Sequence, residues 1–172
     1  LADTVLRIFR DPEEHRRMAG CEDTLWHYAA LHGNVRRALV RAGMHAEGEL
    51  LDAGCGTGGL LRRLRGWWPQ ARVRGVELSA FAVGLARERT DCTIDEGSVL
   101  ALPCADESLD AITCVDVVYQ LPDPGAAYRE AARCLRPGGV LVVNEPAHRW
   151  LYSYHDVSVG GRQRFARKEL LG

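Results

Sequence analysis

Short apolar runs alternate with amphipathic segments along most of the chain. Consecutive apolar residues are typical of strands buried on both faces, whereas apolar residues three and four positions apart are typical of helices. The apolar runs predict strands at residues 50–53, 73–77, 93–94, 111–115 and 140–143. Amphipathic stretches predict helices near residues 60–64, 80–89 and 124–135, and Pro137-Gly138-Gly139 predicts a turn before the last strand. We therefore expect an α/β fold in which helices cover both faces of a parallel sheet.

Two more amphipathic segments, residues 13–19 and 22–42, precede the first strand and predict N-terminal helices. Asp23 or Thr24 is placed to cap the start of the second one. After the fifth strand, the chain is dense in aromatic residues and ends in a pattern typical of the start of a helix. The expected parts are a helical layer or lid at 1–47, a core at 48–147, and an aromatic loop with a helix start at 148–172.

Composition is that of an ordinary globular domain. The 172 residues are 47% hydrophobic and 26% charged, with a net charge of −1. This balance gives no overall field that favours nucleic acid or an anionic membrane. We find no apolar run near the roughly 20 residues that span a bilayer, and no signal-peptide core. The expectation is a cytoplasmic protein with six reduced cysteines and no metal site, because the cysteine spacings match no zinc motif.

The first predicted strand runs into a glycine-rich turn. Glycines let the chain turn tightly and let a ligand approach the backbone, and the following helix offers free N–H groups. Gly54, Gly56 and Gly59 also match the GxGxxG spacing of dinucleotide sites. Glu77 ends the second strand, where a carboxylate can accept hydrogen bonds from both hydroxyls of a ribose. The pattern indicates an adenosine-containing ligand, either NAD or S-adenosylmethionine.

Asp52 helps to choose between these two ligands. It precedes the first glycine by two positions, at the mouth of the first strand. A carboxylate is unfavourable beside a pyrophosphate, because like charges repel in a partly desolvated cleft. It suits a ligand that carries an ammonium and a sulfonium group. S-adenosylmethionine carries both.

Four motifs, in order, resemble those of the class I, Rossmann-like S-adenosylmethionine-dependent methyltransferases. They are residues 52–58, residues 76–79, the region formed by 97–103, 108–110 and 116–124, and residues 133–141. The resemblance covers about residues 49–147. It implies a seven-stranded fold, S-adenosylmethionine as cofactor, and N-terminal helices that close over it.

The resemblance also implies which residues bind the cofactor. These are Asp52, Gly54, Cys55, Gly56, Gly58, Glu77, Leu78, Gly97, Ser98, Val99, Val115 and Asp116. One position departs from the family pattern: Ser98 follows Gly97, where the family often has an acid that meets the adenine amino group. A serine hydroxyl is a weaker acceptor than a carboxylate.

The acceptor is expected beside the ends of the fourth and fifth strands, because ligands of open parallel sheets bind at the carboxyl ends. Tyr119 and Gln120 follow the fourth strand, and Trp150 and Tyr152 belong to the aromatic loop after the fifth. We expect these four to contact a small-molecule acceptor. Methyl transfer needs a base only if the acceptor atom is protonated. The candidates are Glu145, His148 and His155, of which Glu145 and His148 are favoured.

The leading hypothesis is transfer of a methyl group to an O, N or C nucleophile of a small molecule. The alternatives are a non-catalytic relative that binds cofactor or a partner protein and, less favoured, an NAD-dependent oxidoreductase. A nucleic-acid acceptor is disfavoured because the Asn/Asp-Pro-Pro-Tyr run of some nucleic-acid methyltransferases is absent after the fourth strand.

The length of chain after the fifth strand limits the fold. About 28 residues remain, whereas a helix and two further strands need on the order of 50. The sequence therefore predicts a fold without strands six and seven. The bare edge of strand five would then be covered by further chain or by a second copy in a homodimer.

Overall fold

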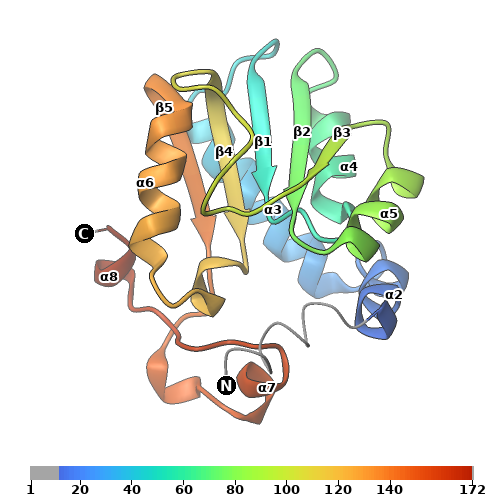
Figure 1. Ribbon diagram of the computed structural model, residues 1–172, viewed down its shortest axis with the longest axis vertical. Helices are drawn as coiled ribbons and strands as arrows, with labels where there is room; N and C mark the ends of the chain where they lie inside the picture. Colours follow the sequence, from blue (N-terminus) through green and yellow to red (C-terminus); the bar gives the residue numbers. More distant parts are fainter. Residues whose placement is uncertain (1–11, 172) are drawn as a thin grey trace.

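The computed structural model describes residues 12–171. Its centre is a parallel sheet of five strands in the order β3-β2-β1-β4-β5 (Figure 1). The strands are β1 Glu49–Ala53, β2 Arg72–Glu77, β3 Thr93–Glu96, β4 Leu109–Val115 and β5 Leu135–Asn144. The five predicted strands and their parallel arrangement are confirmed. Strand order reverses between β1 and β4, which is the switch point where open α/β sheets bind ligands.

Helices cover both faces of this sheet. They are α2 Pro12–Cys21, α3 Trp26–Arg41, α4 Gly59–Trp67, α5 Ala80–Arg89, α6 Pro124–Cys134, α7 Tyr154–Ser158 and α8 Arg167–Leu171, with 3-10 turns η1 Val118–Gln120 and η2 Arg149–Leu151. Side chains alternate between the faces of a strand. Leu50 accordingly packs with residues of α3, α4 and α5, whereas Leu51 packs with residues of α6. Figure 1 shows the helices on the two faces of the sheet. The N-terminal helix α3 thus shares the core of the sheet.

Two local expectations are corrected. Neither Asp23 nor Thr24 caps α3, because the N-cap is Leu25 and Asp23 instead pairs with Arg62 and Arg89. The turn expected at residues 137–139 lies inside β5. There the register jumps, since Leu109 pairs with Leu135 and Ala111 with Val140, so the extra residues form a bulge.

The chain after β5 folds back on itself. Ala147 and Phe165 form a parallel bridge that brings the two ends of the segment together. Inside it the buried Asp156 accepts hydrogen bonds from the Arg164 guanidinium at 2.7 and 3.0 Å. Asp156 also forms the capping box of α7 with Ser153. These contacts give a mostly irregular segment a defined shape.

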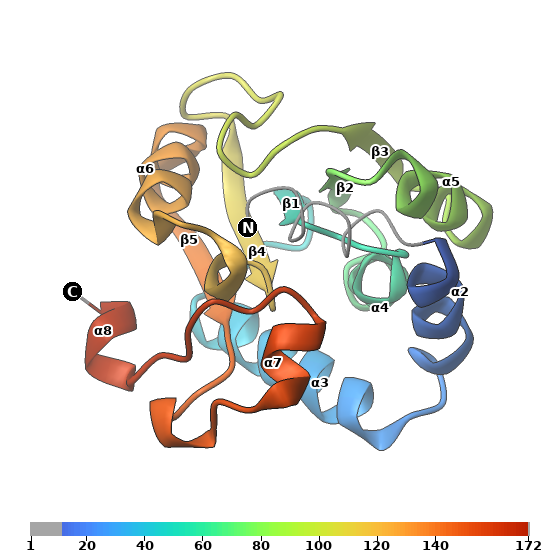
Figure 2. The same ribbon diagram turned by 60° about the horizontal axis from the view of Figure 1, so that its bottom comes forward.

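Within residues 12–171, β5 pairs only with β4, so its outer edge stays open. No helix of this range is long and apolar enough to cross a membrane. The six cysteines are all unpaired in the structure. Figure 2 shows the carboxyl ends of the strands, with α2, α3 and α7 arranged around them.

Candidate cofactor and acceptor site

The glycine-rich turn connects β1 to α4 at the switch point of the sheet. Gly54, Gly56 and Gly58 have φ angles of 82°, 54° and 86°, a region that L side chains rarely adopt. The Gly54 and Cys55 N–H groups donate to the Val76 carbonyl at 2.8 and 3.0 Å, which ties the turn to the end of β2. The predicted loop therefore has the conformation that close backbone approach requires.

Asp52 lies beneath this loop and is 2% exposed. The Thr113 hydroxyl donates to its Oδ1 at 2.7 Å. Burial raises the pKa of Asp52 to about 7, and the carboxylates of Glu22 and Glu77 contribute to the rise. None of the groups in the described range that act on this pKa is a cation. Among residues 12–171, Asp52 is therefore a buried acid without a counter-charge.

Glu77 lies at the carboxyl end of β2, beside the loop. Its Oε2 accepts the Gly56 N–H at 3.0 Å, and its Oε1 accepts the Ser79 N–H at 2.8 Å. Ser79 in turn caps α5 by accepting from Ala82 at 3.4 Å. The carboxylate is therefore fixed where the glycine loop, β2 and α5 meet.

Asp116 follows β4 and supplies a third carboxylate at this end of the sheet. Its φ angle is 53°, unusual for a residue with a side chain. The backbone N–H donates to the Asn144 carbonyl at 2.8 Å, so the turn is fixed to the end of β5. Burial raises the pKa of Asp116 to about 6, and His27 on α3 opposes the rise.

Glu145 supports the loop after β4. Its Oε1 accepts the Val117 and Val118 N–H groups at 3.1 and 2.9 Å, and its Oε2 accepts the Tyr119 N–H at 3.2 Å. Burial raises the pKa of Glu145 to about 8, although the three N–H donors oppose the rise. Both carboxylate oxygens are therefore engaged with backbone.

The predicted acceptor residues divide into the buried Tyr119 with the half-buried Gln120 and an exposed set. The Tyr119 ring is buried, and Gln120 Nε2 donates to the Tyr119 hydroxyl at 3.0 Å and to the Val159 carbonyl at 3.1 Å. Trp150 is 79% exposed, and its ring lies 5.9 Å from that of His148, which is also exposed. Tyr152 is exposed, and its hydroxyl donates to the Gly161 carbonyl.

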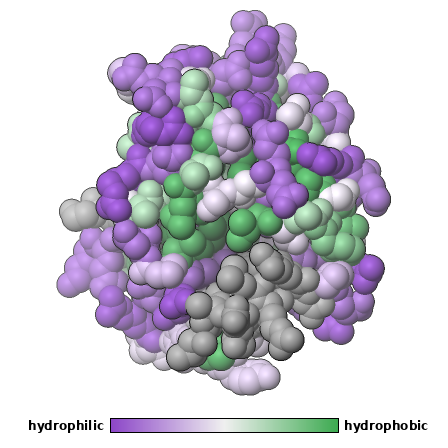
Figure 3. All heavy atoms as spheres, viewed as in Figure 1, coloured by the Kyte–Doolittle hydropathy of each residue, from purple (hydrophilic) through white to green (hydrophobic). Residues whose placement is uncertain are grey.

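The residues expected near adenine lie around the ends of β2, β3 and β4. Leu78 is 51% exposed, a large apolar side chain at the mouth of the site. Ser98 uses its hydroxyl to accept the Leu100 N–H at 3.2 Å. The Gly97 N–H donates to the Glu77 carbonyl. Figure 3 shows apolar side chains gathered across the middle of one face, over the connection from β3 to β4.

Three other predicted contacts lie mostly inside the protein. Val99 packs against the buried apolar residues on the α6 side of the sheet. Val115 packs against those on the opposite side, which α3, α4 and α5 cover. The Cys55 side chain is buried, and its sulfur would lie 2.7 Å from a Cβ placed on Gly75. The Cys55 thiol therefore faces β2, so only its backbone is available to a ligand.

Sequence reasoning missed the contribution of α2 and of the turn that follows it. Met18 Cε would lie 3.0 Å from a Cβ on Gly56, and Glu22 Oε2 accepts the Thr57 hydroxyl proton at 2.6 Å. Met18 and Glu22 are far from Gly56 and Thr57 in the sequence. Each of the two resembles an ordinary surface position when considered alone. The one available signal was Thr57, a hydroxyl within the glycine run.

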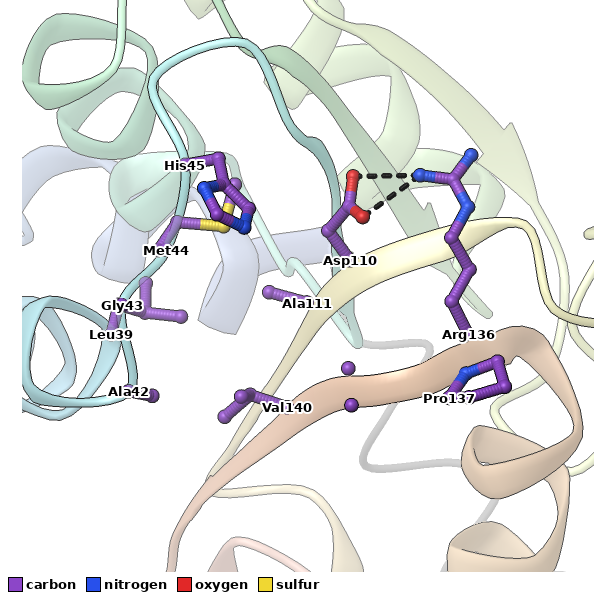
Figure 4. A pocket seen from close by; sticks show the side chains of 12 residues that line it. Leu39, Ala42, Gly43, Met44, His45, Asp110, Ala111, Arg136, Pro137 and Val140 are labelled. Atoms are coloured by element: carbon purple, nitrogen blue, oxygen red, sulfur yellow. Dashed lines mark hydrogen bonds and ion pairs between the residues drawn. The ribbon is translucent and has the colours of Figure 1, made fainter.

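A pocket also lies away from these groups, at the opposite end of the sheet (Figure 4). It lies between the C-terminal end of α3 and the start of β4 and β5. Asp110 forms an ion pair with Arg136 beside it, at 2.8 Å. None of the predicted site residues lines this pocket. The candidate site is therefore the glycine loop together with Asp52, Glu77 and Asp116 at the carboxyl ends of the strands, which we call the carboxyl-end cluster.

The carboxyl-end cluster fits S-adenosylmethionine. Three carboxylates, Asp52, Glu77 and Asp116, stand at the ends of β1, β2 and β4, and two of them have raised pKa values. A cationic ligand lowers the cost of their ionisation, whereas a pyrophosphate raises it. The glycines with positive φ angles carry no side chain, so a ligand can approach the loop backbone at these positions. Fold and site together define the class of Rossmann-like, S-adenosylmethionine-dependent methyltransferases.

Comparison with protein families agrees with this assignment. Residues 51–143 match the family described as "Methyltransferase domain". Because the match extends over more than half of the chain, the protein belongs to this family.

Relatives with assigned activities cover parts of the same region. The chain is 34% identical over 121 residues to the malonyl-[acyl-carrier protein] O-methyltransferase of Hahella chejuensis, covering 66% of this chain and 43% of the relative. It is 37% identical over 114 residues to the demethylmenaquinone methyltransferase of Roseiflexus sp., covering 63% and 48%. The chain spans less than half the length of these relatives.

Solved structures extend the similarity to the fold. A complex from Haloferax volcanii between the Trm112 methyltransferase activator and a methyltransferase matches with a TM-score of 0.74 and 28% identity, over 90% of this chain and 68% of that one. Geranyl diphosphate C-methyltransferase from Streptomyces coelicolor, solved with S-adenosyl-L-homocysteine, matches with a TM-score of 0.68 and 22% identity, over 84% and 59%. The latter likeness concerns the fold alone.

Proposed function

We propose that the protein transfers a methyl group from S-adenosylmethionine to a small-molecule acceptor. The observation that carries this proposal is the buried carboxyl group of Asp52, which lies beneath a positive-φ glycine loop and has no cationic partner within residues 12–171. Asp52 would face the cationic part of the cofactor, and Glu77 would accept hydrogen bonds from the ribose hydroxyls. Leu78 and the segment 97–99 would lie along the adenine.

The cofactor supplies an activated methyl group on a sulfonium, with a neutral sulfide as the leaving group. The chain has to bind the acceptor, exclude water and align the acceptor atom about 3 Å from the methyl carbon. The loop after β4 and the aromatic segment after β5 lie at the correct end of the sheet for this task. Relatives that act on malonyl-[acyl-carrier protein] and on demethylmenaquinone support an acceptor from metabolism rather than nucleic acid.

We propose different roles for the two candidate bases. Glu145 holds the acceptor loop through three backbone N–H groups, so it acts by positioning that loop. His148 is exposed and its ring lies beside that of Trp150, so its imidazole is the group available to accept a proton from an alcohol or phenol acceptor. An acceptor with a carbanion-like or amine nucleophile needs no such base.

Two measurements test the function. Calorimetry with S-adenosylhomocysteine and with NAD should show binding of the first and none of the second. Transfer of a labelled methyl group from S-adenosylmethionine to fractionated metabolites should then yield a labelled small molecule. Binding without transfer to any fraction would favour the alternative of a cofactor-binding relative, while NAD binding would overturn the assignment altogether.

A further inference from the structure

The turn between α2 and α3 places an acid against the glycine loop. Glu22 is 5% exposed, and its Oε2 accepts a hydrogen bond from the Thr57 hydroxyl at 2.6 Å. The same oxygen pairs with Nη1 of Arg89, at the C-terminal end of α5. Thr57 stands between Gly56 and Gly58 and is fully buried. One carboxylate therefore joins the N-terminal helices to the loop that would hold the cofactor.

Arg89 completes the connection from the other side. Its Nη1 also donates to the Thr57 backbone carbonyl at 2.8 Å and to the Thr57 hydroxyl oxygen at 2.9 Å. Both the backbone and the side chain of Thr57 are thus fixed by the same guanidinium. Asp23 adds a partly exposed ion pair to Nη2 at 3.2 Å, which is screened by solvent and weaker.

Two glycines of the loop leave the space that Glu22 and Met18 occupy. A Cβ on Gly59 would lie 2.7 Å from the Glu22 carboxyl carbon, and one on Gly56 would lie 3.0 Å from Met18 Cε. Met18 and Glu22 are four residues apart, so they share one side of α2 and of the turn that follows it. That side rests on the glycine loop.

A buried ion pair adds little net stability compared with apolar packing, and its best-supported use is to select one arrangement. Here the arrangement selected is the seating of α2 on the cofactor loop. We propose that Glu22, through Thr57 and Arg89, is a positioning residue for cofactor binding: it fixes α2 over the glycine loop and the loop in its binding conformation. This inference rests on the proposed function.

Calorimetry with S-adenosylhomocysteine as the probe tests it on the whole chain. Glu22→Ala and Arg89→Met should each raise the Kd by about tenfold to a hundredfold, within the range of typical coupling between sites. The double variant should be little worse than either single one, because the pair acts as a unit. Glu22→Gln keeps an acceptor for Thr57 but loses the charge, so its Kd should be intermediate.

Glu130→Ala is the matched control. Glu130 also pairs with an arginine, Arg133, at 2.7 Å, but on α6 rather than on the glycine loop. It should lower the melting temperature without changing the Kd. Amides of residues 12–22 should exchange hydrogen more slowly when S-adenosylhomocysteine is added to the wild type, and this protection should be lost in Glu22→Gln.

The outcomes separate the two proposals. Wild-type binding, together with an unchanged Kd in folded Glu22→Gln and Arg89→Met, would overturn the positioning role and leave the proposed function intact. Absence of binding in the wild type would overturn the proposed function and this inference with it. Because Glu22→Gln keeps the volume of the side chain, it decides the matter if Glu22→Ala does not fold.

Discussion

The Glu145 carboxylate accepts the backbone N–H of Val118 at 2.9 Å, so the residue that follows β5 supports the loop that follows β4. The neighbouring N–H groups of Val117 and Tyr119 donate to the same carboxylate. The shape of the predicted acceptor side thus depends on a side chain from the adjacent strand.

The first prediction separates support from base catalysis at Glu145. Glu145→Gln keeps a carbonyl oxygen for the Val117 and Val118 N–H groups, so methyl transfer should fall by less than about tenfold. A general base would lose on the order of a hundredfold or more. Glu145→Ala leaves three backbone donors unpaired, two of them buried, and should cost about 1–3 kcal/mol of unfolding free energy. Urea unfolding and labelled-methyl assays measure the two effects.

Asp52 gives a pH dependence. Its folded-state pKa of about 7 lies above the ordinary 3.8, so the folded chain holds the proton more tightly than the unfolded chain. The stability of the cofactor-free protein should therefore decline as the pH rises from about 4 through 7. The Kd for S-adenosylhomocysteine should fall over pH 6 to 8, because the ionised form attracts its ammonium group. Asp52→Asn should make both profiles shallower, while Asp116 and Glu145, whose pKa values are also raised, still contribute to the slope of stability. An unchanged pH dependence in that variant would count against the assignment.

Glu77 should bind the ribose hydroxyls. Glu77→Ala is expected to weaken S-adenosylhomocysteine binding by about 1.5–3 kcal/mol, the scale of hydrogen bonds to a charged group. Since Glu77 also accepts the Gly56 N–H, part of this loss reflects the loop itself. Glu96→Ala at the end of β3, where the side chain is exposed, is the control and should bind normally. Equal affinities of the two variants by calorimetry would contradict the prediction.

Gly56 should tolerate no side chain. Its φ angle is 54°, and a Cβ would meet Met18. Gly56→Val should abolish cofactor binding while circular dichroism shows a folded protein. Gly66→Ala is the matched control, because a Cβ there meets nothing within 4 Å and the residue is helical. That change should stabilise the protein by about 0.5–1 kcal/mol and leave binding intact.

The aromatic segment should depend on one ion pair. Asp156 is buried, so Arg164→Ala leaves its carboxylate without a counter-charge. Chymotrypsin should then cleave rapidly near Tyr152 and Tyr154 while the sheet survives. Arg162→Ala is the control, since its side chain is exposed and its backbone N–H donates to Tyr119. Comparable cleavage rates in both variants would show that the pair does not hold the segment.

Much of this arrangement follows from local patterns. The sequence predicts β1, β4 and β5 from near-continuous apolar residues, whereas residues 73–77 and 93–94 give weaker patterns. Glu77 is predicted as a site residue because an acid ends the second strand. The Glu145 contacts were not predicted, since they depend on the register between β4 and β5. The Glu22 and Arg89 pair joins residues 67 positions apart, and charged side chains at such separations carry no periodic signal. The β5 bulge was read as a turn because Pro137, Gly138 and Gly139 favour both.

The bridge between Ala147 and Phe165 has a consequence for how this site can diversify. The segment between those residues begins and ends at neighbouring points, and the ion pair of Asp156 and Arg164 lies within it. Such a piece can be exchanged between homologous proteins as a cassette, with both junctions unchanged. The carboxylates of β1, β2 and β4 lie outside it. On the proposed assignment, in which this segment lies on the acceptor side, replacement of one peptide can change the acceptor preference while the carboxylates proposed for the cofactor stay unaltered.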